Sequence, residues 1–295
     1  MTINTEIVLV HDGRALLGEG PIWHARHGVL YWVDILGHAL HVFDPVAGQD
    51  RAINVGQPVG TVVPRTAGGV MLALRDGFAS LDLETEELRL ICDPEAHLHD
   101  NRFNDGKCDP AGRFWAGTMR LTEDRTGAGS LYCLDRDLTV RKMWSQVTVS
   151  NGIAWSLDAT TMYYIDTPTC AVVAFDYDLA TGAIANPRPV ISTPDGPGRP
   201  DGMTIEAEGM LWVAYWDGWS VVRWDPRNGR ELARIATPAA RTTACWFGGP
   251  DLGDLYITSA RAGLSETALA GQPHAGGLFR ARPGVCGLPA FEFGG

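Results

Sequence analysis

The sequence lacks the features that mark exported and membrane-bound proteins. Its six cysteines are scattered, with no Cys-x-x-Cys pair. The longest apolar run near the N-terminus, residues 7–10, is far shorter than the core of a signal peptide. No apolar stretch reaches the length of about 18 residues that a membrane-spanning helix needs. We therefore expect reduced thiols and a cytoplasmic location.

The chain also lacks a surplus of positive charge. It has 24 Lys and Arg residues against 35 Asp and Glu residues, a formal net charge of −11. Nucleic acids and anionic membranes both require a basic surface, so neither is an expected partner. An acidic surplus collected in a funnel would instead attract cations.

Sustained helical periodicity is absent as well, and a repeat of short strands takes its place. An aromatic or aliphatic strand recurs six times, and turn residues from a total of 35 glycines and 18 prolines separate the copies. The copies lie at residues 30–34, 70–74, 113–117, 162–166, 210–214 and 254–258. Repeats of this length built from short strands are typical of β-propeller blades. The sequence thus predicts an all-β protein, a six-bladed β-propeller.

The spacing of the repeat supports six blades in a single domain covering residues 1–295. The residues that open each first strand are spaced by 42, 43, 47, 50 and 44 positions. We place these anchors at Glu19, Thr61, Asn104, Asn151, Asp201 and about Cys245. Each unit has room for four strands, which in the fourth blade would cover about residues 152–155, 162–166, 170–177 and 188–192.

Four of the anchors carry oxygen-bearing side chains. Equivalent positions in a radial array face one axis, so Glu19, Asn104, Asn151 and Asp201 should converge on the central channel. Carboxylate and amide oxygens suit Ca²⁺, Mg²⁺ or Mn²⁺. The scarcity of His and Cys in the ring argues against a dedicated zinc site, although Zn²⁺ or Fe²⁺ could occupy it. We therefore predict a metal site in the channel.

A simpler interpretation of each anchor is a turn. Asn-Gly and Asp-Gly are common turn dipeptides, and Asn151 and Asp201 are both followed by glycine. The shared position of four such residues in four blades favours the metal site, since two acids brought together need a cation or a raised pKa.

Two further groups of residues have weaker signals. Trp216 and Trp219 follow a strand and could line a sugar-sized pocket. The four histidines of the first blade are irregularly spaced, and we interpret them as surface or strand-end residues: His24, His27, His38 and His41.

Several ordered motifs resemble one known family. They are Gly18-Glu19-Gly20-Pro21, residues 101–107 (NRFNDGK) with 109–113 (DPAGR), Gly117-Thr118-Met119, Ser150-Asn151-Gly152 and Pro200-Asp201-Gly202-Met203. Together they resemble the regucalcin/gluconolactonase family, also called the senescence-marker-protein family. The similarity runs from about residue 15 to about residue 285.

The resemblance implies a six-bladed propeller that holds one divalent cation, most simply Ca²⁺, and hydrolyses sugar lactones to aldonic acids. Carried over by position, it implies Glu19, Asn151 and Asp201 as metal ligands and Asp201 as general base. It implies that Arg102 and Asn104 bind the sugar. A further substrate-binding acid falls on Glu123, where the sequence is offset from the family pattern.

Two alternatives remain open at this stage. Calcium-containing six-bladed propellers also hydrolyse organophosphates and aryl esters, and a non-catalytic calcium-binding regulatory protein is a third possibility. Residues 120–128 and 215–219 would select the sugar, and we expect a monomer or a weak homo-oligomer.

Overall fold

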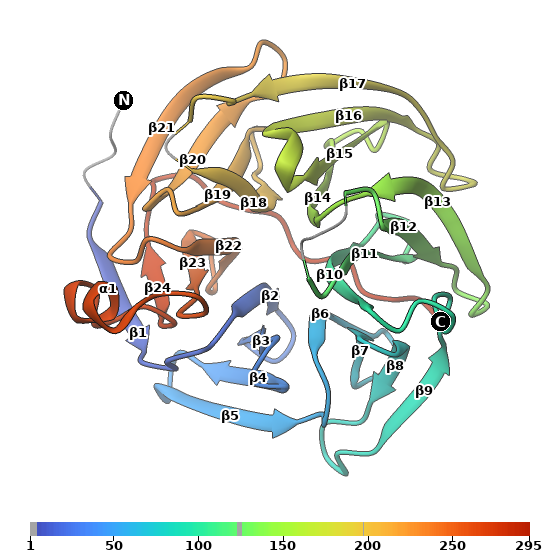
Figure 1. Cartoon of the computed structure of the whole chain (residues 1–295), viewed down its shortest axis with the longest axis horizontal. Helices are drawn as coiled ribbons and strands as arrows, with labels where there is room; N and C mark the ends of the chain where they lie inside the picture. Colours follow the sequence, from blue (N-terminus) through green and yellow to red (C-terminus); the bar gives the residue numbers. More distant parts are fainter. Residues whose placement is uncertain (1–4, 123–125, 197) are drawn as a thin grey trace.

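The computed structural model describes residues 5–122, 126–196 and 198–295. Six antiparallel sheets of four strands each surround a central channel (Figure 1). The innermost strands follow one another around the channel in the order of the blades, and the last of them packs against the first. The prediction of an all-β, six-bladed propeller is confirmed. No helix in the described ranges is long and apolar enough to cross a bilayer.

The first three blades run outward from the channel in chain order. Blade 1 comprises β2 (Gly18–His24), β3 (Val29–Asp34), β4 (Ala39–Asp44) and β5 (Gln49–Asn54). Blade 2 comprises β6 (Val59–Pro64), β7 (Val70–Leu74), β8 (Gly77–Leu81) and β9 (Leu88–Cys92). Blade 3 comprises β10 (Asn101–Cys108), β11 (Phe114–Arg120), β12 (Gly129–Leu134) and β13 (Val140–Val147).

The next two blades repeat this order. Blade 4 comprises β14 (Ser150–Trp155), β15 (Thr161–Asp166), β16 (Ala171–Tyr177) and β17 (Ile184–Ser192), with a 3₁₀ turn, η1 (Thr167–Thr169), before β16. Blade 5 comprises β18 (Arg199–Ile205), β19 (Leu211–Trp216), β20 (Ser220–Asp225) and β21 (Arg230–Ala236).

Blade 6 is assembled from both ends of the chain. Its inner strands are β22 (Thr242–Gly248), β23 (Asp254–Ser259) and β24 (Leu278–Ala281), and a short helix, α1 (Glu266–Gly271), lies between the last two. The outermost strand is β1 (Ile7–His11), which pairs antiparallel with β24. This pairing closes the ring, because the first strand of the chain completes the last blade (Figure 1).

The structure confirms the predicted second strand of every blade to within a few residues. Two of the predicted anchors were misplaced, however. A register shift interrupts each innermost strand, and Thr61 and Cys245 lie just after it. Asn104, Asn151 and Asp201 lie just before the point where pairing resumes. In blade 6 the residue equivalent to Asp201 is Thr243, which a single-residue bulge makes difficult to locate by counting.

Aromatic side chains fill the space between neighbouring blades. Trp32, Trp115 and Trp212 lie on the second strands of their blades and are almost completely buried. Trp115 meets Trp155 of the following blade edge to face, with 6.1 Å between ring centroids. Each such burial stabilises the fold by roughly 1.5–3 kcal/mol, so the blades are bound to one another mainly by apolar packing.

Glycines allow the innermost strands to approach one another closely. A Cβ atom at Gly152 of β14 would lie 2.7 Å from the Cβ atom of Met203 and 2.8 Å from the carbonyl oxygen of Asp201, both on β18. A Cβ atom at Gly60 of β6 would lie 2.7 Å from the carbonyl carbon of Phe103 on β10. Neither position has space for a side chain, so these glycines fix the width of the channel.

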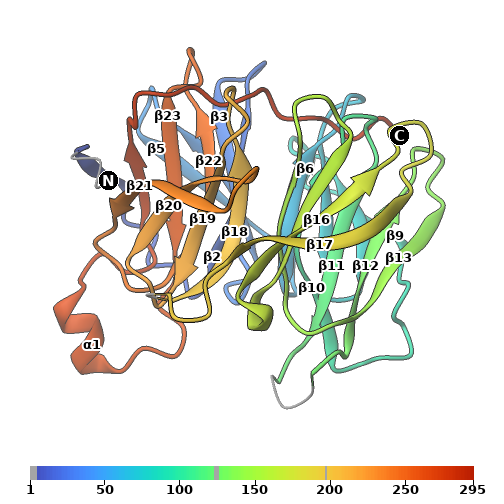
Figure 2. The same cartoon turned by 90° about the horizontal axis from the view of Figure 1, so that it is seen from above.

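The C-terminal segment crosses the end of the channel at which the innermost strands finish. Phe293 donates its backbone N–H to Pro64 O at the end of β6, and Gly294 donates to Gly112 O just beyond β10. Gly287 forms a bridge with Glu206 beyond β18. Figure 2 shows this red segment along one face of the molecule, opposite the face that carries α1.

We predict that Gly60→Ala destabilises the protein, because the added methyl group overlaps the backbone of β10 in the neighbouring blade. The expected loss of unfolding free energy is roughly 1–3 kcal/mol, measured by urea denaturation. Gly271→Ala is the matched control, since a Cβ atom there meets nothing within 4 Å. Equal stability of the two variants would contradict the packing argument.

Candidate functional site

A cavity opens at the end of the channel where the innermost strands begin. Its volume is about 120 Å³, enough for a cation and several waters. The residues that line it include all of the predicted ligand and sugar-binding positions that the structure describes, namely Glu19, Arg102, Asn104, Asn151 and Asp201. They come from β2, β10, β14 and β18, four strands of four different blades.

The interpretation of these anchors as turns is wrong. Glu19, Asn151 and Asp201 lie within strands and are only 5%, 3% and 4% exposed. The glycines that follow Asn151 and Asp201 are required by close packing between strands and not by a turn. Gly20, after Glu19, has a φ of +52°, which lets the strand bend at the register shift.

Asn151 is oriented by a hydrogen-bond chain from its own blade to the next. Its Nδ2 donates to Thr167 Oγ1 at 2.8 Å, and this hydroxyl donates to Pro200 O at 2.9 Å. Because the amide nitrogen is used in this way, Asn151 Oδ1 is left as the acceptor, and Asn104 Nδ2 lies 3.4 Å from it. Thr167 therefore fixes which atom Asn151 presents.

The buried carboxylate of Asp201 lacks a full set of hydrogen-bond partners. Its Oδ1 is buried and has no hydrogen-bond partner in the described part of the chain. Burial, followed by the charges of Glu19 and Asp105, raises the pKa of Asp201 well above its ordinary value. Burial and the nearby Asp105 charge likewise raise the pKa of Glu19 to about 8. A bound cation would relieve both effects, so the residues present fit one.

Arg102 and Asn104 form a fixed polar pair beside these carboxylates. Arg102 Nη1 donates to Asn104 Oδ1 at 2.7 Å and to Phe103 O at 2.9 Å. Asn104 Nδ2 donates to Ser150 O at 2.7 Å, which connects β10 to β14. Both side chains are buried, so a guanidinium group is held in a defined place in the wall of the cavity.

Several residues for which the sequence predicted no role lie in or behind the cavity. Thr167, Arg199 and Met119 line it, and Asp105 lies behind it with an unpartnered buried Oδ2. Asp105 directly follows Asn104 on the strand, and its place in the motif at residues 101–107 (NRFNDGK) was the signal that could have indicated it.

The other sequence predictions have mixed outcomes. Trp216 lines the cavity as suggested, whereas Trp219 does not line it and is 45% exposed. Glu123 lies outside the described residues. The interpretation of the first-blade histidines as surface or strand-end residues is wrong for His41, which is buried within β4.

Comparison with known proteins places the chain in a family. Residues 17–261 match the family described as "SMP-30/Gluconolactonase/LRE-like region". The YvrE protein of Bacillus subtilis (strain 168), whose name proposes a sugar lactone lactonase, is 43% identical over 290 residues, covering 98% of this chain and 99% of its own. Regucalcin of Gallus gallus is 41% identical over 297 residues, covering 99% of each chain.

A solved structure agrees with these sequence matches. The calcium-binding protein regucalcin of Agrobacterium tumefaciens strain C58 superposes with a TM-score of 0.92 at 30% sequence identity. The superposition covers 97% of this chain and 96% of that protein. The chain described here belongs to the SMP-30/gluconolactonase/regucalcin family.

Proposed function

We propose that the protein hydrolyses a sugar (aldono-)lactone to the aldonic acid in the channel cavity. The observation that carries the proposal is the convergence of two buried carboxylates and an oriented amide oxygen beside a fixed guanidinium group. The similarity to YvrE, whose name proposes a sugar lactone lactonase, supports the substrate class.

We propose Glu19, Asn151 and Asp201 as the ligands of one divalent cation. Two carboxylates and an amide oxygen form an all-oxygen donor set, which favours Ca²⁺ and accepts Mg²⁺ or Mn²⁺. The calcium-binding description of the Agrobacterium regucalcin supports the same choice. When bound, the cation polarises the lactone carbonyl and stabilises the negative charge that develops on its oxygen.

Asp201 is the proposed general base. Its carboxylate accepts a proton as the oxygen of a water molecule bonds to the lactone carbonyl carbon. The bond between that carbon and the ring oxygen then breaks, and the ring oxygen takes the proton and becomes a hydroxyl group. One water is consumed, and the product is the open-chain acid. No covalent nucleophile is needed, since lactones are activated esters.

Arg102 and Asn104 are the proposed sugar-binding residues. The Arg102 guanidinium group carries donors for sugar hydroxyl or ring oxygens, and its bonds to Phe103 O and Asn104 fix its orientation before substrate arrives. The side chains of Met119 and Trp216 add apolar surface to the same cavity, against which the carbon skeleton can lie. A small polyol with one carbonyl group fits this mixture better than an apolar ester.

We predict that turnover requires a divalent cation. In a pH-indicator assay, chelated protein should not hydrolyse any member of a panel of aldonolactones above the spontaneous rate. Adding Ca²⁺, Mg²⁺, Mn²⁺, Zn²⁺ or Fe²⁺ in turn should restore hydrolysis and identify the preferred metal and sugar.

Parallel assays with aryl esters and organophosphates test the main alternative, which is a hydrolase of those substrates. Faster turnover of those substrates than of every lactone would contradict the proposal. Tight calcium binding with no turnover of any substrate would instead indicate a regulatory protein.

We predict that Asp201→Ala lowers kcat by about 10²- to 10⁴-fold, the usual contribution of a general base. Asp137→Asn is the control, because Asp137 is an exposed carboxylate in the turn between β12 and β13. It should keep wild-type turnover. Circular dichroism should show the same fold for both variants, and wild-type activity in Asp201→Ala would remove Asp201 from the mechanism.

We predict that stability of the chelated protein falls as pH rises. The folded-state pKa of Glu19 is raised from 4.5 to about 8, so its stabilising contribution is complete below 4.5 and is lost as pH rises through about 8. Asp201 acts in the same direction. Thermal unfolding at a series of pH values should show this decline, and saturating Ca²⁺ should reduce it.

Asp201→Asn should make the decline of the chelated protein shallower, because it removes one of the two buried acids. Asp137→Asn should leave the wild-type profile unchanged over the same range. A chelated wild-type protein whose unfolding midpoint does not change between the two ends of this range would refute the electrostatic argument.

A further inference from the structure

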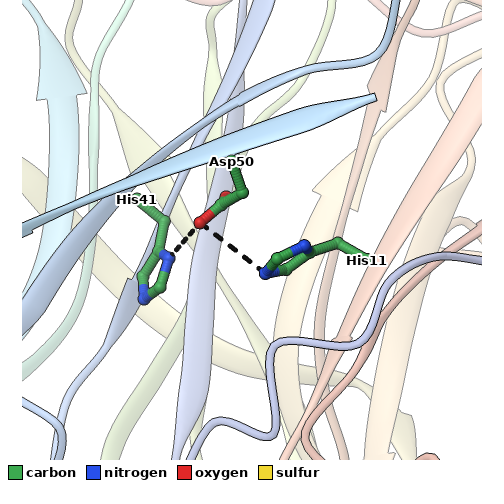
Figure 3. A group of neighbouring side chains, drawn as sticks. All are labelled: His11, His41 and Asp50. Carbon is green, nitrogen blue, oxygen red and sulfur yellow. Dashed lines mark hydrogen bonds and ion pairs between the residues drawn. The ribbon is translucent and has the colours of Figure 1, made fainter. Parts of the chain in front are cut away.

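A second group of potential metal ligands lies away from the channel, where the ring closes. His11 ends β1 of blade 6, whereas His41 and Asp50 belong to β4 and β5 of blade 1 (Figure 3). None of the three lines the channel cavity. Within the described ranges they form the one group of three such side chains whose ligand atoms all lie within 4.8 Å of one another.

Two imidazole nitrogens lie near one oxygen of Asp50. Asp50 Oδ2 lies 2.6 Å from His41 Nδ1 and 3.7 Å from His11 Nε2. A tetrahedral ion with bonds of about 2.0–2.1 Å holds its donor atoms about 3.3 Å apart. One observed separation is shorter than this and the other is longer. The two separations differ from this value by about 0.7 Å and about 0.4 Å, and the ligand atoms of His11 and His41 lie within 4.8 Å of each other, so small side-chain rotations would give all three atoms a common centre.

A second set of contacts already orients the carboxylate and one imidazole. Trp32 Nε1 donates to Asp50 Oδ1 at 2.9 Å, which leaves Oδ2 facing the two histidines. The His41 ring stacks on Trp32, with 3.9 Å between centroids and an angle of 21°. Outer hydrogen bonds and packing of this kind are typical around metal ligands because they fix the direction of the donor atom.

His11 completes the group from the other blade. The centroid of its ring lies 6.1 Å from that of Trp32 and 6.2 Å from that of Phe43. These two aromatic side chains form an apolar wall that limits the rotation of His11. The side chain of Asp50 is 3% exposed and that of His41 is 11% exposed, whereas that of His11 is 29% exposed. The group is thus buried on the blade 1 side and accessible beside His11, where water can supply a further ligand.

We propose that His11, His41 and Asp50 form a second divalent-metal site, selective for Zn²⁺ and similar ions. Two imidazole nitrogens and one carboxylate oxygen are the donors that Zn²⁺ prefers, and three protein ligands leave a position for water. Ca²⁺ and Mg²⁺ prefer oxygen ligands, so they should bind here weakly. This site is independent of the function proposed for the channel.

Binding at this site would connect the two ends of the ring. His11 is the last residue of the strand that closes blade 6, and its two partners belong to the neighbouring blade 1. An ion held by all three binds the folded state and not the unfolded chain, so it stabilises the closed propeller by mass action. The role assigned to the ion is therefore structural, unlike that of the cation in the channel.

The test is a titration of Ca²⁺-saturated protein with Zn²⁺. Calorimetry measures the number of Zn²⁺ ions bound, and the thermal unfolding midpoint measures the stabilisation that they give. Co²⁺ serves as a spectroscopic probe, because tetrahedral Co²⁺ absorbs visible light strongly. Wild-type protein should bind about one more equivalent of Zn²⁺ than His11→Ala does, and its midpoint should rise with Zn²⁺. His274→Ala is the control, since His274 is an exposed histidine in a turn of the same blade as His11.

Two results decide the proposal. Loss of one Zn²⁺ equivalent and of the Co²⁺ absorption in His11→Ala, but not in His274→Ala, supports it. Equal Zn²⁺ binding by all three proteins would overturn it, and the group would then be only a hydrogen-bonded pair with a nearby histidine. His11→Gln provides a second variant in case the alanine variant folds poorly, and lactone hydrolysis with Ca²⁺ reports that the channel is intact in each.

Discussion

The close approach of the six innermost strands around the channel is the constraint on which the structure depends. Glycine at positions such as Gly60 and Gly152 lets one blade lie directly against the next, because no Cβ atom has to fit between them. The buried tryptophans of the second strands then fill the wedge-shaped space farther out. Together these features place side chains from different blades around a single cavity without any loop having to fold over it.

The same constraint determines the chemistry available in the channel. Glu19, Asn151 and Asp201 are held by closely packed strands, so two carboxylates stay buried in one cavity. The charge of Glu19 disfavours ionisation of Asp201, and the charge of Asp105 disfavours ionisation of both. A flexible site would relax by letting water reach one of them. Because the strands are rigid, the channel keeps a position that is electrostatically favourable for a cation, and the metal-free protein is less stable as a result. Thr167 and Arg102 extend this rigidity to the amide and to the proposed sugar-binding wall.

Much of this arrangement could be predicted from the sequence because a propeller repeats a local pattern. The second strand of each blade and the convergence of Glu19, Asn151 and Asp201 follow from the periodic spacing. Other features depend on contacts that no local pattern encodes. The register shifts in the innermost strands displaced the predicted anchors of blades 2 and 6. Asn-Gly and Asp-Gly inside strands resemble turns in the sequence, because the close packing that requires their glycines comes from a neighbouring blade. The group of His11, His41 and Asp50 joins three strands from two blades, so irregular sequence spacing concealed it.

The pairing of β1 with β24 has a consequence for how the protein is made. A ribosome releases residues 7–11 before residues 278–281, so β1 must remain without its partner while the strands between them emerge. An apolar strand such as Ile-Val-Leu-Val with an open edge is prone to pair with other chains during that interval. The time between the synthesis of β1 and that of β24 is therefore an interval in which the new chain is exposed to aggregation.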